Sequence, residues 1–166
     1  GMYQQVLKEC EKAIKEYPKS YMLYNIIGLA NAGLGFLDTS VTNYKKAISG
    51  NPYHAASYYN MGVVLQQHDL LDQALKAYKK SLNIRPNYAQ AHYNMGKALR
   101  DLGLLEEAVS SYQKALSIKP DYAEALNNMA NALKDLGETE KALVIIDKAL
   151  AVNPNYANAY FNKGSI

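Results

Sequence analysis

Apolar residues along this chain return at helical spacing. The stretch from 99 to 116 shows the pattern most clearly, with apolar side chains at Leu99, Leu102, Leu105, Ala108, Val109, Tyr112, Ala115 and Leu116. Residues three and four positions apart share one face of an α-helix, so this spacing predicts amphipathic helices. No stretch alternates apolar and polar residues with a period of two, so no β-strand is expected.

The pattern repeats every 34 residues. Prolines mark the period, at Pro18, Pro52, Pro86, Pro120 and Pro154. Alignment on them gives four complete repeats, residues 21–54, 55–88, 89–122 and 123–156, with a second-helix fragment at 2–20 and a first-helix fragment at 157–166. A glycine or aspartate predicts a turn in the middle of each repeat, at Gly35, Asp69, Gly103 and Gly137. Each repeat is therefore expected to fold as a pair of helices.

The third repeat carries a recognisable set of positions, namely His92, Met95-Gly96, Leu99, Ala108, Tyr112 and Pro120. The second repeat has Tyr58, Met61-Gly62, Leu65, Ala74, Tyr78 and Pro86 at the same places. These positions resemble the aromatic, Leu-Gly, Tyr, Ala, Phe and Pro pattern of the tetratricopeptide repeat (TPR) family. The resemblance covers the whole of residues 1–166 as a single array. It implies an all-α fold, a right-handed superhelical solenoid of antiparallel helix pairs with a concave groove lined mainly by first helices.

Two repeats depart from the family pattern. The first repeat has Asn31 and Ser40 where a leucine or aromatic and an alanine are usual, and the fourth has Ala130 and Ile146 where a glycine and an aromatic are usual. Both sets of changes are expected to weaken the helix contacts locally without changing the architecture.

Charge and composition narrow the function classes. Eighteen Lys and Arg against fifteen Asp and Glu give a net charge of +3, which disfavours a nucleic-acid surface. No segment approaches the roughly 18 unbroken apolar residues of a membrane-spanning helix. The single cysteine, Cys10, excludes an intrachain disulfide and is consistent with a reducing compartment, so a cytoplasmic location is expected.

No catalytic or metal-binding motif is present. The three histidines, His54, His68 and His92, belong to no HExxH pattern, and there is no CxxC and no glycine-rich phosphate loop. The histidines and Cys10 fall at packing or turn positions, and Glu106-Glu107 opens a helix, where acidic residues are favourable. We therefore expect a non-enzyme without metal or cofactor.

The sixth residue of successive repeats is asparagine, at Asn60, Asn94, Asn128 and Asn162. Asparagine is a mediocre helix former, so helix propensity does not explain the row. One interpretation is that the amides bind the backbone of an extended peptide, since each amide both donates and accepts hydrogen bonds. The other is that each amide bonds the backbone of a neighbouring repeat and fixes the superhelix. The row resembles the asparagine ladder in the superhelix of O-linked N-acetylglucosamine transferases and their bacterial relatives.

Neighbouring positions of the first helices complete the predicted peptide-binding groove. They are Tyr59, Gln66 and Gln67 in the second repeat, Gln90, Tyr93, Lys97, Arg100 and Asp101 in the third, and Asn127, Asn131 and Lys134 in the fourth. The first repeat presents Met22, Ile26 and Leu29 instead. These three residues form either an apolar end of the groove or a packing surface for a further repeat upstream.

The sequence favours a protein–protein interaction scaffold that binds an extended peptide segment. A second hypothesis makes the chain the substrate-recruiting arm of a larger enzyme such as a glycosyltransferase, because incomplete repeats at both ends predict excision from a longer protein. Single-stranded nucleic acid is a weaker alternative, with stacking on Tyr59 and Tyr93. The fragment 157–166 lacks a partner helix, so Tyr160 and Phe161 are expected to be partly uncovered and to permit end-to-end association.

Overall fold

The computed structural model describes residues 1–166, which form ten α-helices and no strand. The helices are α1 (Met2–Glu16), α2 (Tyr21–Gly33), α3 (Leu37–Gly50), α4 (Ala55–Gln67), α5 (Leu71–Ile84), α6 (Ala89–Asp101), α7 (Leu105–Ile118), α8 (Ala123–Asp135), α9 (Thr139–Val152) and α10 (Ala157–Ser165). The predicted all-α class is confirmed. Even-numbered helices are the first helices of the 34-residue repeats, and odd-numbered helices are the second helices.

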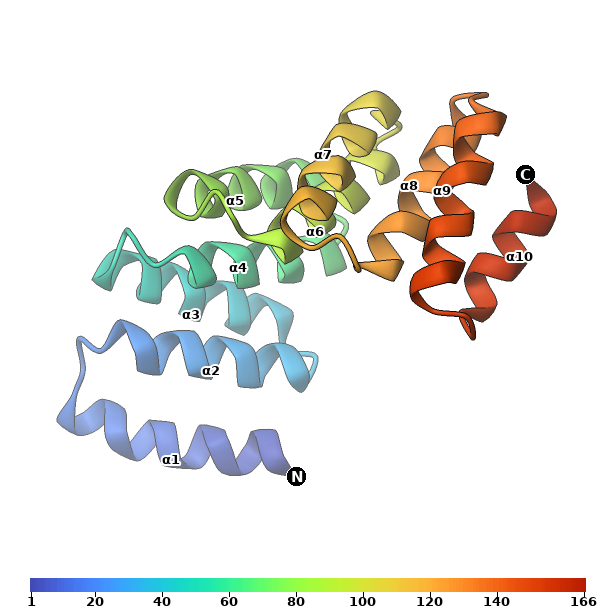
Figure 1. Ribbon diagram of the computed structural model, residues 1–166. Helices are drawn as coiled ribbons and strands as arrows, with labels where there is room; N and C mark the ends of the chain where they lie inside the picture. The colour runs from blue at the N-terminus through green and yellow to red at the C-terminus, as the bar shows by residue number, and fades with distance from the viewer. The chain divides into compact units, whose positions relative to one another are not determined.

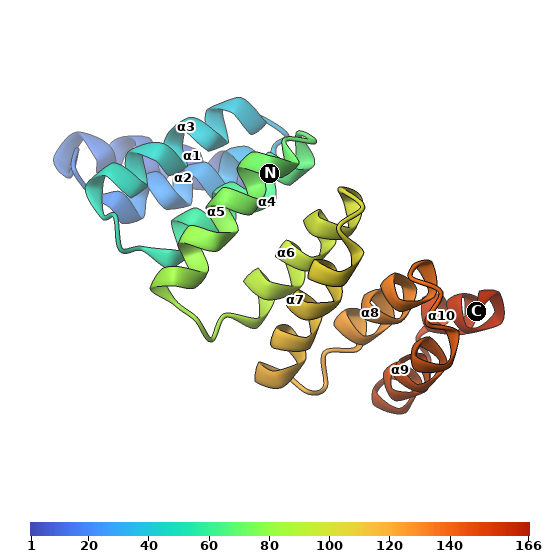
Figure 2. The same cartoon turned by 90° about the horizontal axis from the view of Figure 1, so that it is seen from above.

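The chain divides into two compact units, each with its own packing (Figure 1). In the N-terminal unit, Gly1–Pro86, α2 pairs with α3 and α4 pairs with α5, while α1 packs on α2 and α3 packs on α4. In the C-terminal unit, Asn87–Ile166, α6 pairs with α7 and α8 with α9, α7 packs on α8, and α10 lies against α8 and α9. The view from above shows the same neighbours side by side within each unit (Figure 2).

Close approach of the two helices in a repeat depends on a glycine. A Cβ atom added at Gly62 would lie 2.6 Å from the ring of Tyr78, which is completely buried. The pairs Gly28 with Tyr44 and Gly96 with Tyr112 have the same geometry. In the fourth repeat both partners change together, because Ala130 replaces the glycine and Ile146 replaces the tyrosine. Both residues are fully buried in one cluster, so the smaller Ile146 side chain leaves room for the extra methyl group.

The turn between paired helices uses a left-handed backbone conformation at the predicted positions. The φ angles are 80° at Gly35, 77° at Gly103 and 79° at Gly137, and Asp69 is the one non-glycine residue with a positive φ, 58°. Glycine adopts this conformation without a steric penalty, and aspartate tolerates it better than most residues. This turn brings each first helix back against its second helix.

Ser40 and Asn31, the two polar residues at usually apolar positions of the first repeat, form hydrogen bonds within that repeat. The hydroxyl of Ser40, fully buried, donates to the carbonyl oxygen of Gly28 at 2.7 Å. The side-chain amide of Asn31 donates to the carbonyl oxygen of Ile27 at 2.8 Å. Buried polar groups are tolerated when they are hydrogen-bonded, so these two substitutions leave the repeat intact.

Candidate functional site

The predicted site residues lie on the first helices. Tyr59, Asn60, Gln66 and Gln67 are on α4 in the N-terminal unit, whereas Gln90, Tyr93, Asn94, Lys97, Arg100, Asp101, Asn127, Asn128, Asn131, Lys134 and Asn162 are on α6, α8 and α10 in the C-terminal unit. Positions three and four apart stack on one helical face. We call this face of each unit the first-helix surface. All four asparagines of the sixth-residue row are half-buried on it.

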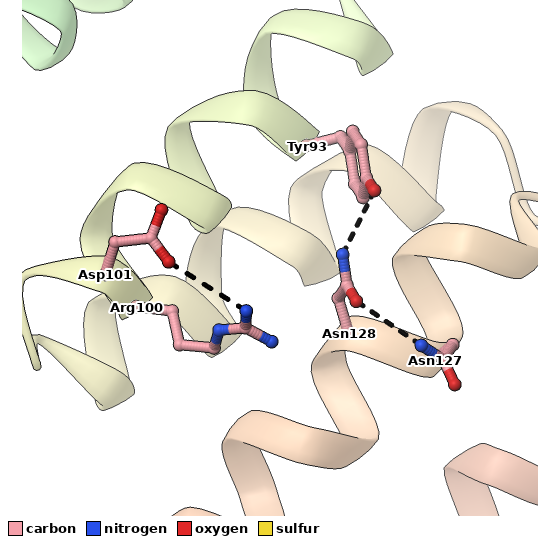
Figure 3. A network of polar contacts seen from close by, with 5 residues as sticks. All are labelled: Tyr93, Arg100, Asp101, Asn127 and Asn128. Carbon is pink, nitrogen blue, oxygen red and sulfur yellow. Dashed lines mark hydrogen bonds and ion pairs between the residues drawn. The ribbon is translucent and has the colours of Figure 1, made fainter. Parts of the chain in front are cut away.

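In the C-terminal unit the row forms a continuous chain of side-chain hydrogen bonds. The amide of Asn162 donates to Oδ1 of Asn127 at 2.8 Å, and Asn127 donates to Oδ1 of Asn128 at 3.3 Å. Asn128 in turn donates to the hydroxyl of Tyr93 at 3.0 Å (Figure 3). This amide relay, comprising Asn162, Asn127, Asn128 and Tyr93, therefore crosses from α10 through α8 to α6.

The N-terminal unit has an equivalent arrangement around Asn25 of α2. Its Oδ1 accepts hydrogen bonds from the amide of Asn60 at 3.4 Å and from the hydroxyl of Ser57 at 3.0 Å. The Ser57 oxygen lies 2.7 Å from Nδ1 of His54. Because the Ser57 proton is given to Asn25, His54 must carry its hydrogen on Nδ1. His54 is therefore part of the packing between repeats.

These bonds identify the structural partner of the asparagine row. In three repeats the sixth-residue asparagine donates to the fifth-residue side chain of the preceding first helix, as Asn60, Asn128 and Asn162 do. The partner is a side chain, where the structural interpretation expected the neighbouring backbone. Each bond uses one N–H of a carboxamide that has two. The second N–H of Asn60, Asn128 and Asn162 is not used in these bonds between repeats.

Tyr93 of α6 is the last residue of the amide relay in the C-terminal unit. Its ring centroid is 4.8 Å from that of Tyr122 and 6.1 Å from that of Tyr112, and the Lys97 ammonium lies 5.9 Å from the ring. Burial raises the pKa of Tyr93, so its hydroxyl is neutral at physiological pH. Oxygen accepts from Asn128, and the hydroxyl proton has no acceptor in the chain. The ring is thus fixed while its proton is available.

Arg100 lies near Tyr93 but has only a loose partner. Its guanidinium Nη2 is 3.9 Å from Oδ1 of Asp101, and the two side chains are 30% and 41% exposed (Figure 3). Exposed pairs of this kind contribute about 0–1 kcal/mol. At the same position of the second repeat, Gln66 accepts a 2.9 Å hydrogen bond from the hydroxyl of Tyr78. Arginine has no acceptor, and the buried hydroxyl of Tyr112 is left without a hydrogen-bond partner.

The rest of the surface in the C-terminal unit is polar and mixed in charge. The Lys134 ammonium donates to the hydroxyl of Ser165 at 3.3 Å. Oδ1 of Asn131 is buried and accepts no hydrogen bond. Gln90 and Asp101 are exposed, and Lys97 is half-buried. These groups add donors and acceptors to the first-helix surface of the C-terminal unit.

The N-terminal unit has a small pocket on its first-helix surface. The pocket has a volume of about 310 Å³ and is lined by Tyr59, Asn60, Val63 and Gln67 of α4, Leu29 and Gly33 of α2, and Tyr3 of α1. Beside it, Met22, Ile26 and Leu29 are 58%, 40% and 52% exposed. No helix of the structure covers these three apolar side chains, which lie next to the pocket on α2.

A second groove was not predicted from the sequence. It lies between α7, α8 and α9, has a volume of about 560 Å³, and is lined by apolar side chains that include Met129, Leu133 and Val144. The available signal was Val144, which is 57% exposed and stands where the other repeats have Thr42, Lys76 and Ser110. An exposed valine at a position that is otherwise polar marks this groove.

No arrangement of residues suggests catalysis. No group of three or more His, Cys, Asp or Glu side chains is placed to hold a metal ion. Cys10 is buried, and this burial raises the pKa of its thiol, the opposite of what a nucleophilic cysteine requires. His92 is buried on α6, and His68 ends α4. None of the ten helices is long and apolar enough to cross a lipid bilayer.

Comparison with solved structures gives close matches of fold. A crystal structure of MamA superposes with a TM-score of 0.87 at 22% identity, over 93% of this chain and 91% of that one. MamA from Desulfovibrio magneticus gives a TM-score of 0.86 at 20% identity, over 95% and 89% of the two chains. A thermophilic TPR protein of Thermus thermophilus gives 0.75 at 24% identity, over 98% and 89%. No curated protein sequence matches the chain.

Family models match the repeats themselves. The model described as TPR repeat matches residues 71–103 and 96–137, and the model described as tetratricopeptide repeat matches residues 123–156. Together the matches run from residue 71 to residue 156, more than half of the chain. With the helix pairs, the glycine–tyrosine contacts and the left-handed turns described above, they show that the chain belongs to the tetratricopeptide repeat family.

Proposed function

We propose that this protein is a non-catalytic scaffold that binds an extended segment of a partner protein on its first-helix surface. The TPR fold is consistent with a protein–protein interaction scaffold. The observation that carries the finer proposal is the amide relay from Asn162 to Tyr93. It presents hydrogen-bonding groups on three successive first helices, as the backbone of an extended peptide does along its length.

The relay supports peptide binding because its amides are already ordered. Asn127 and Asn128 are held by neighbouring side chains on both sides, and burial fixes Tyr93. Binding normally costs about 0.5–1.5 kcal/mol for each flexible side chain that becomes immobilised. Because these side chains are already immobilised in the folded protein, most of that cost does not arise on binding. More of the hydrogen-bond energy then contributes to the affinity for the peptide.

The effect of Arg100 on the stability of the fold also supports peptide binding on the first-helix surface. At this position Gln66 satisfies the hydroxyl of Tyr78, whereas Arg100 leaves the hydroxyl of Tyr112 unsatisfied. A buried group without its partner costs about 1–3 kcal/mol. A residue that lowers stability on an accessible surface is best explained by a role in binding, and a guanidinium is well suited to a carboxylate or a peptide carbonyl.

The expected energies require anchors besides the asparagines. A hydrogen bond contributes about 0.5–1.5 kcal/mol net, so three or four amide contacts give roughly 2–6 kcal/mol. Micromolar affinity needs about 8 kcal/mol. The difference is expected to come from side-chain anchors in each unit, namely Arg100 and the edge of Tyr93 in the C-terminal unit, and the pocket beside Asn60 in the N-terminal unit.

Binding of single-stranded nucleic acid receives less support. Base stacking needs an accessible aromatic face. The ring of Tyr93 packs against Tyr122 and Tyr112 and has Lys97 over it. The second hypothesis, in which the chain recruits substrates for a larger enzyme, would use the same first-helix surface. It differs from the main proposal only in the identity of the bound partner, which would be an enzyme substrate.

The experiment is a peptide-array screen followed by mapping of the bound peptide. Selected peptides are titrated into isotope-labelled protein, and amide shift changes are followed by NMR. The proposal expects the largest changes on α4, α6 and α8 at Asn60, Tyr93, Asn128 and their neighbours. Lys114→Ala, on a second helix, is the control and leaves affinity unchanged. Shift changes confined to second helices would overturn the proposal.

A further inference from the structure

The groove between α7, α8 and α9 is lined by none of the residues of the amide relay. Met129 and Leu133 of α8 line it together with Val109 of α7 and Val144 of α9. Met129 is two residues from Asn127 of the amide relay, a rotation of about 200° around α8, which places these two side chains on opposite faces of the helix. A ligand in this groove would therefore not compete with one bound along the amide relay.

The groove has an acidic rim with two unpaired carboxylates. Glu106 of α7 and Glu138, Glu140 and Lys141 of α9 all line it. The Lys141 ammonium lies 2.7 Å from a carboxylate oxygen of Glu138, so these two charges offset each other. Glu106 and Glu140 are exposed and have no cationic partner in the chain. An apolar floor is thus bordered by two free negative charges.

The chain contains an internal comparison for this feature. The corresponding groove of the N-terminal unit lies between α3, α4 and α5 and has a volume of about 220 Å³. It is lined by Lys45, Lys76 and Lys80, and no carboxylate borders it. Position by position, Val144 stands in place of Lys76 and Gln113 in place of Lys45. The larger volume and the replacement of two lysines are therefore properties of the C-terminal unit, whereas acidic residues occur at the positions of Glu106 and Glu140 in both units, as Asp38 and Asp72.

Val144 leaves an apolar side chain open to solvent at the edge of the groove. Val144 is 57% exposed and gains little from packing in the free protein. A volume of about 560 Å³ is within the range of roughly 300–1,000 Å³ that ligand sites occupy. The two flanking second helices leave α8 as the floor, an arrangement suited to side chains of a third helix inserted between them.

We propose that this groove is a second docking site, which binds an amphipathic basic helix of a partner protein. The apolar stripe of that helix packs on Met129, Leu133 and Val144, and its Lys or Arg residues pair with Glu106 and Glu140. The occupant is assigned from charge complementarity, because an acidic partner would be repelled by the rim. With the first-helix surface free, the protein joins two partners at once.

The test uses two synthetic 14-residue helical peptides with the same leucine stripe, one with lysines and one with glutamates on its polar face. Fluorescence anisotropy with the full chain is expected to show binding of the lysine peptide, at least tenfold tighter than the glutamate peptide. Shift changes in NMR spectra are expected at Val109, Met129 and Val144. Absence of lysine-peptide binding up to millimolar concentration, or shift changes confined to the first-helix surface, overturns the proposal.

Variants of groove residues test whether the lysine peptide binds in this groove. Val144→Lys restores the residue type of Lys76 at an exposed position, and it is expected to weaken lysine-peptide binding at least tenfold. Glu106→Gln with Glu140→Gln is expected to weaken it about fivefold and to reduce its salt dependence. Thr42→Lys, which adds the same charge at the same repeat position in the N-terminal unit, leaves affinity unchanged. Equal effects of Val144→Lys and Thr42→Lys would contradict the proposal.

Discussion

The side-chain amide of Asn128 donates a 3.0 Å hydrogen bond to the hydroxyl of Tyr93, on the first helix of the preceding repeat. The two residues are 35 positions apart in the sequence. The bond connects the sixth residue of one repeat to the fifth residue of the repeat before it. The asparagine row thus joins neighbouring repeats and lies on the surface where a peptide is proposed to bind.

Tyr93→Phe tests the structural part of the relay. Loss of the hydroxyl leaves the half-buried amide of Asn128 without its acceptor, so the free energy of unfolding should fall by about 0.5–1.5 kcal/mol. Urea denaturation measures the change. Tyr53→Phe is the control, because that side chain is 81% exposed, and it should have no effect. Equal stability of the two variants would mean that the relay contributes nothing.

Arg100→Gln should stabilise the protein while weakening peptide binding. A glutamine can accept from the buried hydroxyl of Tyr112, as Gln66 does from Tyr78, which is worth about 1 kcal/mol. Lys134→Gln is the control for stability only and should bring no gain, because the residue opposite in that repeat is Ile146, which has no hydroxyl. Thermal and urea denaturation report stability, and calorimetry reports affinity. A loss of stability in Arg100→Gln would refute the explanation given for this residue.

Gly62→Ala should destabilise the N-terminal unit by about 1–3 kcal/mol, because the new methyl group would lie 2.6 Å from the ring of Tyr78. The double variant Gly62→Ala with Tyr78→Ile copies the pair Ala130 and Ile146, and it should recover part of the loss. Gly164→Ala, where a Cβ meets nothing within 4 Å, is the control and should not destabilise. A double variant less stable than Gly62→Ala alone would contradict the packing account.

The buried side chain of Tyr44 should make the free energy of unfolding depend on pH in the alkaline range. Burial raises the pKa of Tyr44 from 10.0 to about 12, against a smaller opposing effect of its hydrogen bond with Ser40. Because the unfolded chain loses this proton first, the stabilisation is complete below pH 10 and is lost as the pH rises toward 12. Urea denaturation between pH 8 and 12 measures it. The decline should be shallower in Tyr44→Phe, and an equal decline would exclude this residue as a cause.

Self-association stays a separate prediction. Tyr160 and Phe161 of α10 are 56% and 78% exposed. Phe161→Ser should lower the average mass measured by light scattering at high concentration if copies associate through these side chains. A purely monomeric parent protein would argue against the association.

The sequence was sufficient for the repeat and its helix pairs. The proline period fixed the register, and each mid-repeat turn has the positive φ expected at Gly35, Asp69, Gly103 and Gly137. The way in which Ile146 makes room for the methyl group of Ala130 is harder to predict from the sequence, because these two side chains meet only after folding. The destabilising effect of Arg100 could not be predicted from the sequence either, because it depends on the hydroxyl of Tyr112, which is buried and has no hydrogen-bond partner in the folded protein.

The candidate site was predicted as a set of positions but not as a network. The sequence placed asparagines on one helical face, yet whether their amides meet a backbone, a side chain or a ligand depends on distances between helices. The groove between α7, α8 and α9 was not predicted, because Val144 does not differ by residue type from the many apolar residues of these helices. Only its exposure, and the contrast with Lys76 at the same repeat position, separate it from the core.

The most direct test of the first-helix surface is calorimetry with an array-selected peptide and a triple variant, Asn60→Ala, Asn94→Ala and Asn128→Ala. Circular dichroism must first show that the variant is folded. Loss of three amide contacts should weaken binding by roughly 2–5 kcal/mol, a factor of about 30 or more in Kd. Unchanged affinity in a folded triple variant would contradict the proposed function.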